Sequence, residues 1–460
     1  MNPKRLRSLF GGTKSRKASG DLRTEFERDY GRTVYSAPFR RLRDKAQVFP
    51  LEPNDFVRTR LLHSHEVSSV AEDLAAQCVR DVIAKQTRVV HDDLQSIPLI
   101  AATCGLIHDL GNPPFGHAGE LAISSWFEKR FSIDETFHAS LGHHDSQLVQ
   151  DFFKFEGNAH GFRLIAHMFL LADNYGLNFT AATLSAAGKY IAASDKVDEA
   201  NHETSKPGFF ASEEEFFRRV RQATGTENCR HPITYLVEAA DDIVYCSVDL
   251  EDGIKRGVLD WPEVASRLLK ESGKAPIVKT ALADATKHIA PARLRGKEKG
   301  HAMASAFRIA AISRMVIAAR HVFKKRYADI MDGEYHQEIL MDAECEARPF
   351  IEACKTVLRT GLYRNQDVLR LEVRGRKVIH ELLDLFWEGV SSYELSKTTT
   401  RTYSGKLYLL LSENYRRTFE RRLRSGKENE LYCRLQLATD QVAGMTDAHA
   451  CRLHKELTNG

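Results

Sequence analysis

The chain has 460 residues, a formal net charge of +4 and 43% hydrophobic residues. This length supports a large buried core and more than one domain, and so mild a charge does not by itself require a nucleic-acid partner. The eight cysteines are scattered without a CxxC pair, which argues against a disulfide scaffold or a zinc ribbon and predicts reduced thiols.

The first twenty residues carry six Lys/Arg and no acid, which predicts a flexible basic tail over 1–20. They lack the apolar stretch that a signal peptide needs, and no run of eighteen apolar residues occurs further along the chain. We therefore expect a cytoplasmic protein with no membrane-spanning segment.

Apolar residues recur at helical intervals through most of the remaining chain, so the sequence predicts a mostly helical, all-α fold. Two short stretches, Val368–Val373 and Leu407–Leu411, are the best candidates for strands, forming at most one small hairpin. The stretch 196–212 has the composition of a surface loop. The expected helices are 61–85, 119–131, 162–171, 180–191, 234–254, 303–331, 347–362, 378–390 and 428–457.

One polar stretch, HDLGNPPFGHAGE (108–120), directly follows the apolar run 97–107. At a helix end followed by Gly111, the side chains of His108 and Asp109 can turn toward one point. An imidazole beside a carboxylate suits Mn, Fe, Ni or Zn, whereas a shell of carboxylates and waters suits Mg. Two ligands do not hold a metal, so partners must come from elsewhere in the chain. The candidates are His63 or His65 in RTRLLHSHEV and Asp241 or Asp242 in EAADDIVY.

A single His-Asp pair is more often a helix cap, a salt bridge or a buried hydrogen-bonded histidine than a metal site. Here, however, three segments each place such residues within an otherwise apolar helical stretch. Burying those carboxylates unpaired would be costly, and a metal is the usual compensation. The three segments together therefore favour a metal site.

Seven segments together resemble one protein family. They are YGRTVYSAPFRRLRDKAQVFPLE (30–52), VRTRLLHSHEV (57–67), HDLGNPPFGHAGE (108–120), FEGNAHGFRLI (155–165), LNFTAATLSAAGKY (177–190), YLVEAADDIVYCSVDLEDGI (235–254) and QVAGMTDAHACRLHKEL (441–457). They span nearly the whole chain, which is similar to the deoxynucleoside triphosphate triphosphohydrolases, the dGTPase family of the HD-domain phosphohydrolases. The resemblance implies a helical HD-domain core over 21–260 and a helical C-terminal region, 261–460, packed on it.

The resemblance also selects among the candidate ligands. It implies that His65 is structural and that the metal is Mg²⁺, Mn²⁺ or another transition metal. The helical period agrees with Asp241 as the ligand, because Asp241, Tyr245 and Asp249 stand at i, i+4 and i+8 on one face of the helix. Asp242 does not lie on that face. The implied ligand set is His63, His108, Asp109 and Asp241.

The glycine-proline loop would then close the metal site. The prolines at 113–114 stiffen the turn, while Gly111 and Gly116 permit close backbone approach. His117 and Glu120 stand three residues apart at the start of the next helix, where a carboxylate can orient an imidazole for acid–base work. Glu120 alone would also suit a helix N-terminus. The resemblance favours a catalytic pair.

Further positions match substrate contacts of the family. Gln47 and Asp249 match positions around the sugar 3′-hydroxyl, and Tyr245 matches the tyrosine under the deoxyribose, where a 2′-hydroxyl has no room. Without the resemblance, Arg60 and Lys189 would be ordinary solvated cations on helix faces, and Tyr245 would be an ordinary core aromatic. One position departs from the family, since His160 stands where Gln is common. The matched polyphosphate contacts are Arg60, Asn158, Lys189 and Tyr190.

The implied activity is metal-dependent hydrolysis of a deoxynucleoside triphosphate (dNTP), with dGTP favoured, to the deoxynucleoside and inorganic tripolyphosphate. Two alternatives stay open. One is an HD-domain phosphohydrolase of another nucleotide. The other is a nucleic-acid-binding protein whose basic tail and arginines in 416–424 grip phosphate. The resemblance also implies a homo-oligomer, and it leaves single-stranded DNA open as an effector.

Overall fold

The computed structural model describes residues 20, 22–49, 51, 58–86, 91–168, 176–394 and 400–458. The chain is 74% helical, and the sheet within the described residues has two short parallel strands, β1 (Ala192–Ala193) and β2 (Pro207–Phe209). The predicted all-α class is confirmed. The expected basic tail lies outside the described residues except for Gly20.

The helices of the first half of the chain are α2 (Glu25–Val34), α3 (Ala37–Arg41), α4 (Arg60–Cys78), α5 (Ala84–Gln86), α6 (His91–Ile107), α7 (His117–Ile133), α8 (Glu135–Leu141), α9 (Gln147–Phe153), α10 (Gly157–Arg163), α11 (Ala181–Ala186), α12 (Glu214–Thr224) and α13 (Pro232–Lys255). Those of the second half are α14 (Trp261–Glu271), α15 (Pro276–Ile289), α16 (Gly296–Lys325), α17 (Tyr327–Asp332), α18 (Arg348–Val357), α19 (Gln366–Ser391), α20 (Tyr403–Leu410), α21 (Glu413–Ser425), α22 (Glu430–Ala443) and α23 (Asp447–Thr458).

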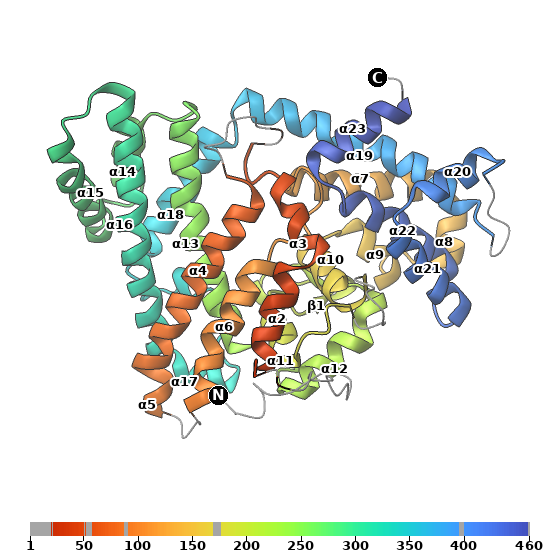
Figure 1. Ribbon diagram of the computed structural model, residues 1–460, viewed down its shortest axis with the longest axis horizontal. Coiled ribbons are helices and arrows are strands. Elements are labelled where there is room, and N and C mark those ends of the chain that lie inside the picture. The colour runs from red at the N-terminus through yellow and green to blue at the C-terminus, as the bar shows by residue number, and fades with distance from the viewer. Residues whose placement is uncertain are drawn as a thin grey trace.

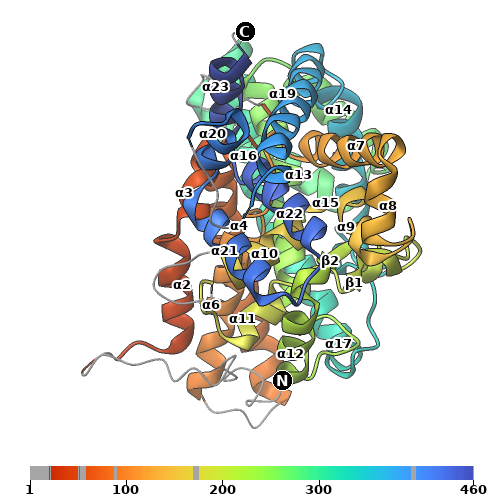
Figure 2. The same cartoon turned by 90° about the vertical axis from the view of Figure 1, so that its right-hand side faces the viewer.

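Two large apolar clusters make up most of the core. On the left of Figure 1, α4, α6 and α13 pack with α14 to α18, and their buried side chains form one cluster. On the right, α19 to α23 pack with α7 to α9 over a second cluster, and in Figure 2 this end of the molecule faces the viewer. The second half of the chain thus contributes to both clusters. The division expected at residue 260 stays a prediction.

The expected hairpin is wrong, because both of its candidate strands lie in helices. Val368–Val373 belongs to α19, and Leu407–Leu411 covers the end of α20 and its C-cap. Six residues of alternation fitted a strand, but α19 continues for 26 residues and buries Val378, Leu382 and Phe386 at intervals of four. The helical period of the longer segment therefore decides the structure.

Most of the other expected helices are confirmed with shifted ends. The stretch 428–457 forms α22 and α23, because the chain turns at Gly444, where a Cβ would lie 2.4 Å from the Tyr415 hydroxyl. The stretch 180–191 is helical only over α11, and the expected loop 196–212 contains the buried strand β2. Residues 169–171 of another expected helix lie outside the described residues.

One described helix, α16, is long and apolar enough to cross a membrane by length and composition alone. Half of its most apolar window is buried inside the protein, with Phe307, Ala311 and Met315 in the first core cluster. This burial is typical of the core helix of a folded domain. All eight cysteines are free, as their scatter in the sequence predicted.

Candidate metal and acid–base site

The four predicted ligands meet where three helices pack together. α4 carries His63, α13 carries Asp241, and His108 and Asp109 directly follow the end of α6. His63 Nε2 lies 3.1 Å from Asp241 Oδ1. His108 Nε2 lies 3.6 Å from both Asp109 Oδ2 and Asp241 Oδ1. The potential ligand atoms of His63, His108 and Asp109 all lie within 4.8 Å of one another.

Gly105 sets both the spacing of two helices and the tautomer of His108. A Cβ at Gly105 would lie 2.6 Å from Ser68 Cα, so the glycine allows α6 to approach α4 closely. Its carbonyl oxygen accepts a hydrogen bond of 2.7 Å from His108 Nδ1. The other ring nitrogen, Nε2, is buried and has no hydrogen-bond partner within the described part of the chain. A hydrogen bond at Nδ1 that leaves Nε2 without a partner is the arrangement that metal-binding histidines have.

The charges around the cluster keep its carboxylates ionised. Arg60 donates a hydrogen bond of 2.7 Å to Asp109 Oδ2. Burial disfavours the charged carboxylate, but Arg60 and the neighbouring histidines outweigh it and hold the pKa of Asp109 well below its usual range. The pKa of Asp241 is lowered by the same balance of burial against His108 and His63. Two ionised carboxylates beside two imidazoles fit a divalent cation.

The sequence neighbours of these ligands point elsewhere. His65 is exposed and packs edge-on against Phe39, with the ring centroids 5.5 Å apart. Asp242 forms an ion pair with Lys355, whose Nζ lies 3.3 Å from Asp242 Oδ2. This geometry fits His63 and Asp241, rather than their neighbours, as ligands. The ligand assignment itself stays a prediction.

The loop after Asp109 packs closely against α10 and enters α7 through a strained turn. A Cβ at Gly111 would lie 2.0 Å from the Gly157 carbonyl oxygen, so a side chain does not fit there. Phe115 and Gly116 both have left-handed backbone, with φ of 64° and 59°. Such a conformation is uncommon for a bulky residue and persists only where the surroundings hold it. His117 follows as the first residue of α7.

His117 and Glu120 form the predicted pair on one face of α7. His117 Nδ1 lies 2.9 Å from Glu120 Oε2, and Glu120 Oε1 accepts a hydrogen bond of 2.8 Å from Gly157 N. The hydrogen bond to Glu120 raises the pKa of His117, against the lowering effect of partial burial. Burial raises the pKa of Glu120, against the lowering effect of His117. An imidazole and a carboxylate in this arrangement can hold and transfer a proton.

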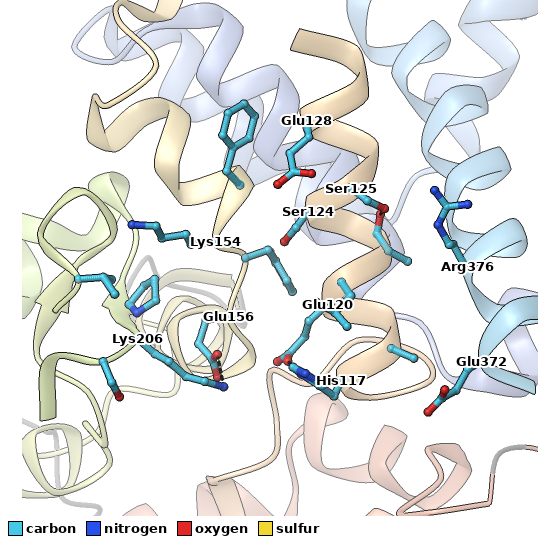
Figure 3. A pocket seen from close by; sticks show the side chains of 18 of the residues that line it. His117, Glu120, Ser124, Ser125, Glu128, Lys154, Glu156, Lys206, Glu372 and Arg376 are labelled. Carbon is cyan, nitrogen blue, oxygen red and sulfur yellow. Dashed lines mark hydrogen bonds and ion pairs between the residues drawn. The ribbon is translucent and has the colours of Figure 1, made fainter. Parts of the chain in front are cut away.

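This pair opens on a cavity of about 720 Å³ between α7, α19 and the segment around β2. Figure 3 shows His117 and Glu120 close together, with Glu156 and Lys206 on one side of them and Glu372 of α19 on the other. Lys206 Nζ lies 2.9 Å from Glu156 Oε2. His117 and Glu120 therefore line a cavity that a ligand can enter, with charged side chains on both sides.

A second cavity, of about 80 Å³, lies beside the predicted metal ligands, and Asn158 and Lys189 line it together with His108, Asp109 and Asp241. Asn158 Nδ2 donates a hydrogen bond of 2.8 Å to Glu156, which caps α10. Lys189 Nζ lies 5.8 Å from the ring centroid of the buried Tyr190. Of the predicted polyphosphate contacts, Asn158 and Lys189 thus lie beside the metal ligands, and Arg60 is paired with Asp109.

The predicted sugar contacts are only partly brought together. Asp249 Oδ2 accepts a hydrogen bond of 2.9 Å from the Tyr363 hydroxyl, and burial raises the pKa of Asp249 to about 7 against the lowering effect of His63. Asp249 Oδ1 and Gln47 Oε1 are buried with no hydrogen-bond partner among the described residues, which leaves both able to accept from a hydroxyl group. Tyr245, half-buried one turn before Asp249, packs on the first core cluster. No described hydrogen bond joins Gln47 to Asp249 or Tyr245.

His160, the position that departs from the family pattern, lies beneath the loop. Its Nδ1 donates a hydrogen bond of 2.9 Å to the Gly111 carbonyl oxygen, and its Nε2 lies 3.6 Å from Asp440 Oδ1 of α22. The side chain is fully buried and lines neither cavity. The imidazole therefore supports the loop backbone.

Known proteins are similar in sequence to this one along nearly the whole chain. A family model described as the phosphohydrolase-associated domain matches residues 339–456. A deoxyguanosinetriphosphate triphosphohydrolase-like protein of Listeria monocytogenes is 35% identical, over 99% of this chain and 98% of its own. The deoxyguanosinetriphosphate triphosphohydrolase of Serratia proteamaculans is 31% identical, over 95% of this chain and 94% of its own. The chain belongs to the deoxyguanosinetriphosphate triphosphohydrolase family. The family predicted from the motifs is confirmed, and with it the class of hydrolase enzymes.

Two contacts of this family member were not predicted from its sequence. Tyr363 follows its partner Asp249 by 114 residues, in a stretch without a polar motif, so no local signal marks it. Asp447 lies in the matched stretch 441–457, and its carboxylate bonds to the backbone N–H of Phe115. The sequence marked that stretch through its resemblance but offered no role for it.

Proposed function

We propose that this protein is a metal-dependent dNTP triphosphohydrolase, which converts a dNTP and water to the deoxynucleoside and inorganic tripolyphosphate. The observation that carries this proposal is the placement of two chemical units on one loop. Asp109 follows the end of α6 within the predicted ligand cluster, and His117, hydrogen-bonded to Glu120 at 2.9 Å, begins α7 eight residues later. Metal ligands and an acid–base pair are the two parts that such a hydrolysis requires.

His63, His108, Asp109 and Asp241 would hold the cation, Mg²⁺ or Mn²⁺ or another transition metal. His108 Nε2, buried without a described hydrogen-bond partner, supports this fit. A bound divalent cation would polarise the α-phosphate and offset its negative charge.

The remaining residues would bind the substrate and handle the proton. Arg60, Asn158, Lys189 and Tyr190 would contact the triphosphate, where cations and amides form charge-assisted hydrogen bonds. Gln47 and Asp249 would accept from the 3′-hydroxyl, and Tyr245 would fill the space of a 2′-hydroxyl.

In the reaction, water attacks the α-phosphorus and the bond from phosphorus to the 5′-oxygen breaks. The 5′-oxygen gains a proton and the attacking water loses one. His117 would make one of these transfers, and the contact between its Nδ1 and Glu120, which orients the imidazole, supports this role.

The names of the two relatives support dGTP as the preferred substrate. One is a deoxyguanosinetriphosphate triphosphohydrolase, and the other is a deoxyguanosinetriphosphate triphosphohydrolase-like protein. The resemblance supports a homo-oligomer in the cytoplasm and keeps single-stranded DNA open as an effector.

The arginines in 416–424 have less charge available for nucleic-acid phosphates than their sequence suggested, because Arg417, Arg422 and Arg424 each form an ion pair with a glutamate. Activity assays with and without single-stranded DNA would separate an effector from a primary ligand.

The experiment for this proposal is an assay of each of the four dNTPs with the purified protein, first with EDTA and then with added Mg²⁺ or Mn²⁺. We expect the deoxynucleoside to form only with metal, and fastest from dGTP. Release of a nucleoside monophosphate or diphosphate, or equal turnover in EDTA, would contradict the proposal.

A further inference from the structure

One buried carboxylate, that of Asp447, links the C-terminal helices to the loop that leads into α7 at His117. Asp447 is the first residue of α23 and is 2% exposed. Its Oδ1 accepts a hydrogen bond of 2.9 Å from Phe115 N, and its Oδ2 accepts one of 2.9 Å from Ala46 N. Phe115 precedes His117 by two residues, and Ala46 directly precedes Gln47. One side chain thus joins the backbone of two segments that carry predicted site residues.

The bond to Phe115 falls at the strained point of the loop. Phe115 has a φ of 64°, a conformation that a bulky residue keeps only where its surroundings hold it. Its ring packs against α19 at Gly375, where a Cβ would lie 2.6 Å from the ring Cγ. The C-terminal helices therefore hold Phe115 by both its backbone and its side chain. The direction in which the chain enters α7 follows from this placement.

A second link joins the same three parts of the protein. The buried Lys45 donates hydrogen bonds to the carbonyl oxygen of Asn112 in the loop and, at 3.3 Å, to that of Ala443 at the end of α22. Its own carbonyl oxygen accepts a hydrogen bond of 2.9 Å from Arg60 N. The loop, the N-terminal segment and the C-terminal helices are thus joined by hydrogen bonds to backbone groups. These bonds fix the distances between the three parts.

We propose that Asp447 is a positioning residue that sets the place of His117 relative to the segment of Gln47. The inference rests on the proposed acid–base role of His117. A carboxylate suits this position because each of its two oxygens must accept from an N–H, and an asparagine side chain would turn an NH₂ group toward one of them. Losing one of these bonds would let the loop relax and move the imidazole away from the reacting atoms.

The test is a double-mutant cycle of Asp447→Asn and His117→Ala, with kcat, KM, bound metal and melting temperature measured for each protein. Asp447→Asn is used rather than Asp447→Ala because it keeps the shape of the side chain and one of its two hydrogen bonds. The asparagine variant should therefore fold even if the alanine variant does not. Glu456→Gln, an exposed carboxylate-to-amide change on the same helix, is the matched control. We expect Asp447→Asn to lower kcat by roughly ten- to a hundredfold with KM and metal content kept. In the His117→Ala background it should cause no further loss, and Glu456→Gln should match the wild type.

The inference is overturned if Asp447→Asn lowers kcat by the same factor in both backgrounds, loses the metal, or leaves kcat unchanged. The cycle also separates this failure from that of the proposed function. If His117→Ala itself keeps the wild-type kcat, the acid–base proposal fails and the inference fails with it. If His117→Ala is impaired but the two changes act independently, only the inference fails.

Discussion

The imidazole of His117 and the carboxylate of Glu120 are joined at 2.9 Å, and the second oxygen of that carboxylate binds the backbone N–H of Gly157 at 2.8 Å. The group that orients the histidine is thus itself fixed to the N-terminus of α10, the helix that carries Asn158. Because both oxygens of the Glu120 carboxylate are held, it can orient His117 without help from a substrate, which suits the proposed acid–base role.

Removal of this pair should stop turnover without releasing the metal. Neither His117 nor Glu120 belongs to the ligand cluster. We expect His117→Ala and Glu120→Ala to keep their bound metal and to lose about 10²–10⁴-fold in kcat, the usual size of acid–base assistance. Elemental analysis beside steady-state kinetics would check this. Metal loss in either variant would show that the residue is a ligand.

The pH profile should report the contact between the two residues. The hydrogen bond to Glu120 raises the pKa of His117 because the carboxylate stabilises the imidazolium ion. Glu120→Gln removes that charge and should lower the pKa of His117. The limb of the kcat/KM profile that belongs to His117 should then move to lower pH. If His117 acts as a general acid, the variant should lose activity at a lower pH than the wild type as the pH rises. If His117 acts as a general base, the variant should gain activity at a lower pH than the wild type. A limb that stays in place or moves to higher pH would contradict the pairing.

Metal binding should distinguish two histidines that stand two residues apart. His63 is buried beside Asp241, whereas His65 is exposed against Phe39. We expect His63→Ala to lose most of its bound metal and all detectable activity, while His65→Ala keeps most of both. Metal content after gel filtration would measure the difference, and equal losses would show that the ligand register is wrong.

Much of this fold and site could be predicted from the sequence, and the failures have physical causes. Polar residues within apolar helical stretches need a reason for their burial, which marked the segments of His63, His108 and Asp241 as a candidate metal site. The resemblance was needed to choose His63 over His65, and the role of these residues as ligands stays a prediction. The hairpin prediction is wrong because six residues of alternation in Val368–Val373 do not distinguish a strand from a helix, whereas burial along the whole of α19 follows the helical period. Tyr363 and Asp447 could not be predicted, because each acts through one hydrogen bond to a distant segment.

The sugar pocket should discriminate against ribonucleotides. A 2′-hydroxyl placed against Tyr245 would lack both space and a hydrogen-bond partner, and an unmade buried hydrogen bond costs about 1–3 kcal/mol before any steric cost. We expect kcat/KM for dGTP to exceed that for GTP by at least about a hundredfold, since each ~1.4 kcal/mol is tenfold. Tyr245→Ala should narrow that gap, mainly by admitting GTP. Similar wild-type values for the two nucleotides would refute the pocket assignment.

Hydrolysis of dGTP in oxygen-18-labelled water would show whether the bond between the α-phosphorus and the 5′-oxygen is the one that breaks. Mass spectrometry of the products identifies both the leaving group and the atom that water attacked. We expect the label in tripolyphosphate and none in deoxyguanosine. Label in the deoxyguanosine, or release of pyrophosphate or orthophosphate as the primary product, would contradict it.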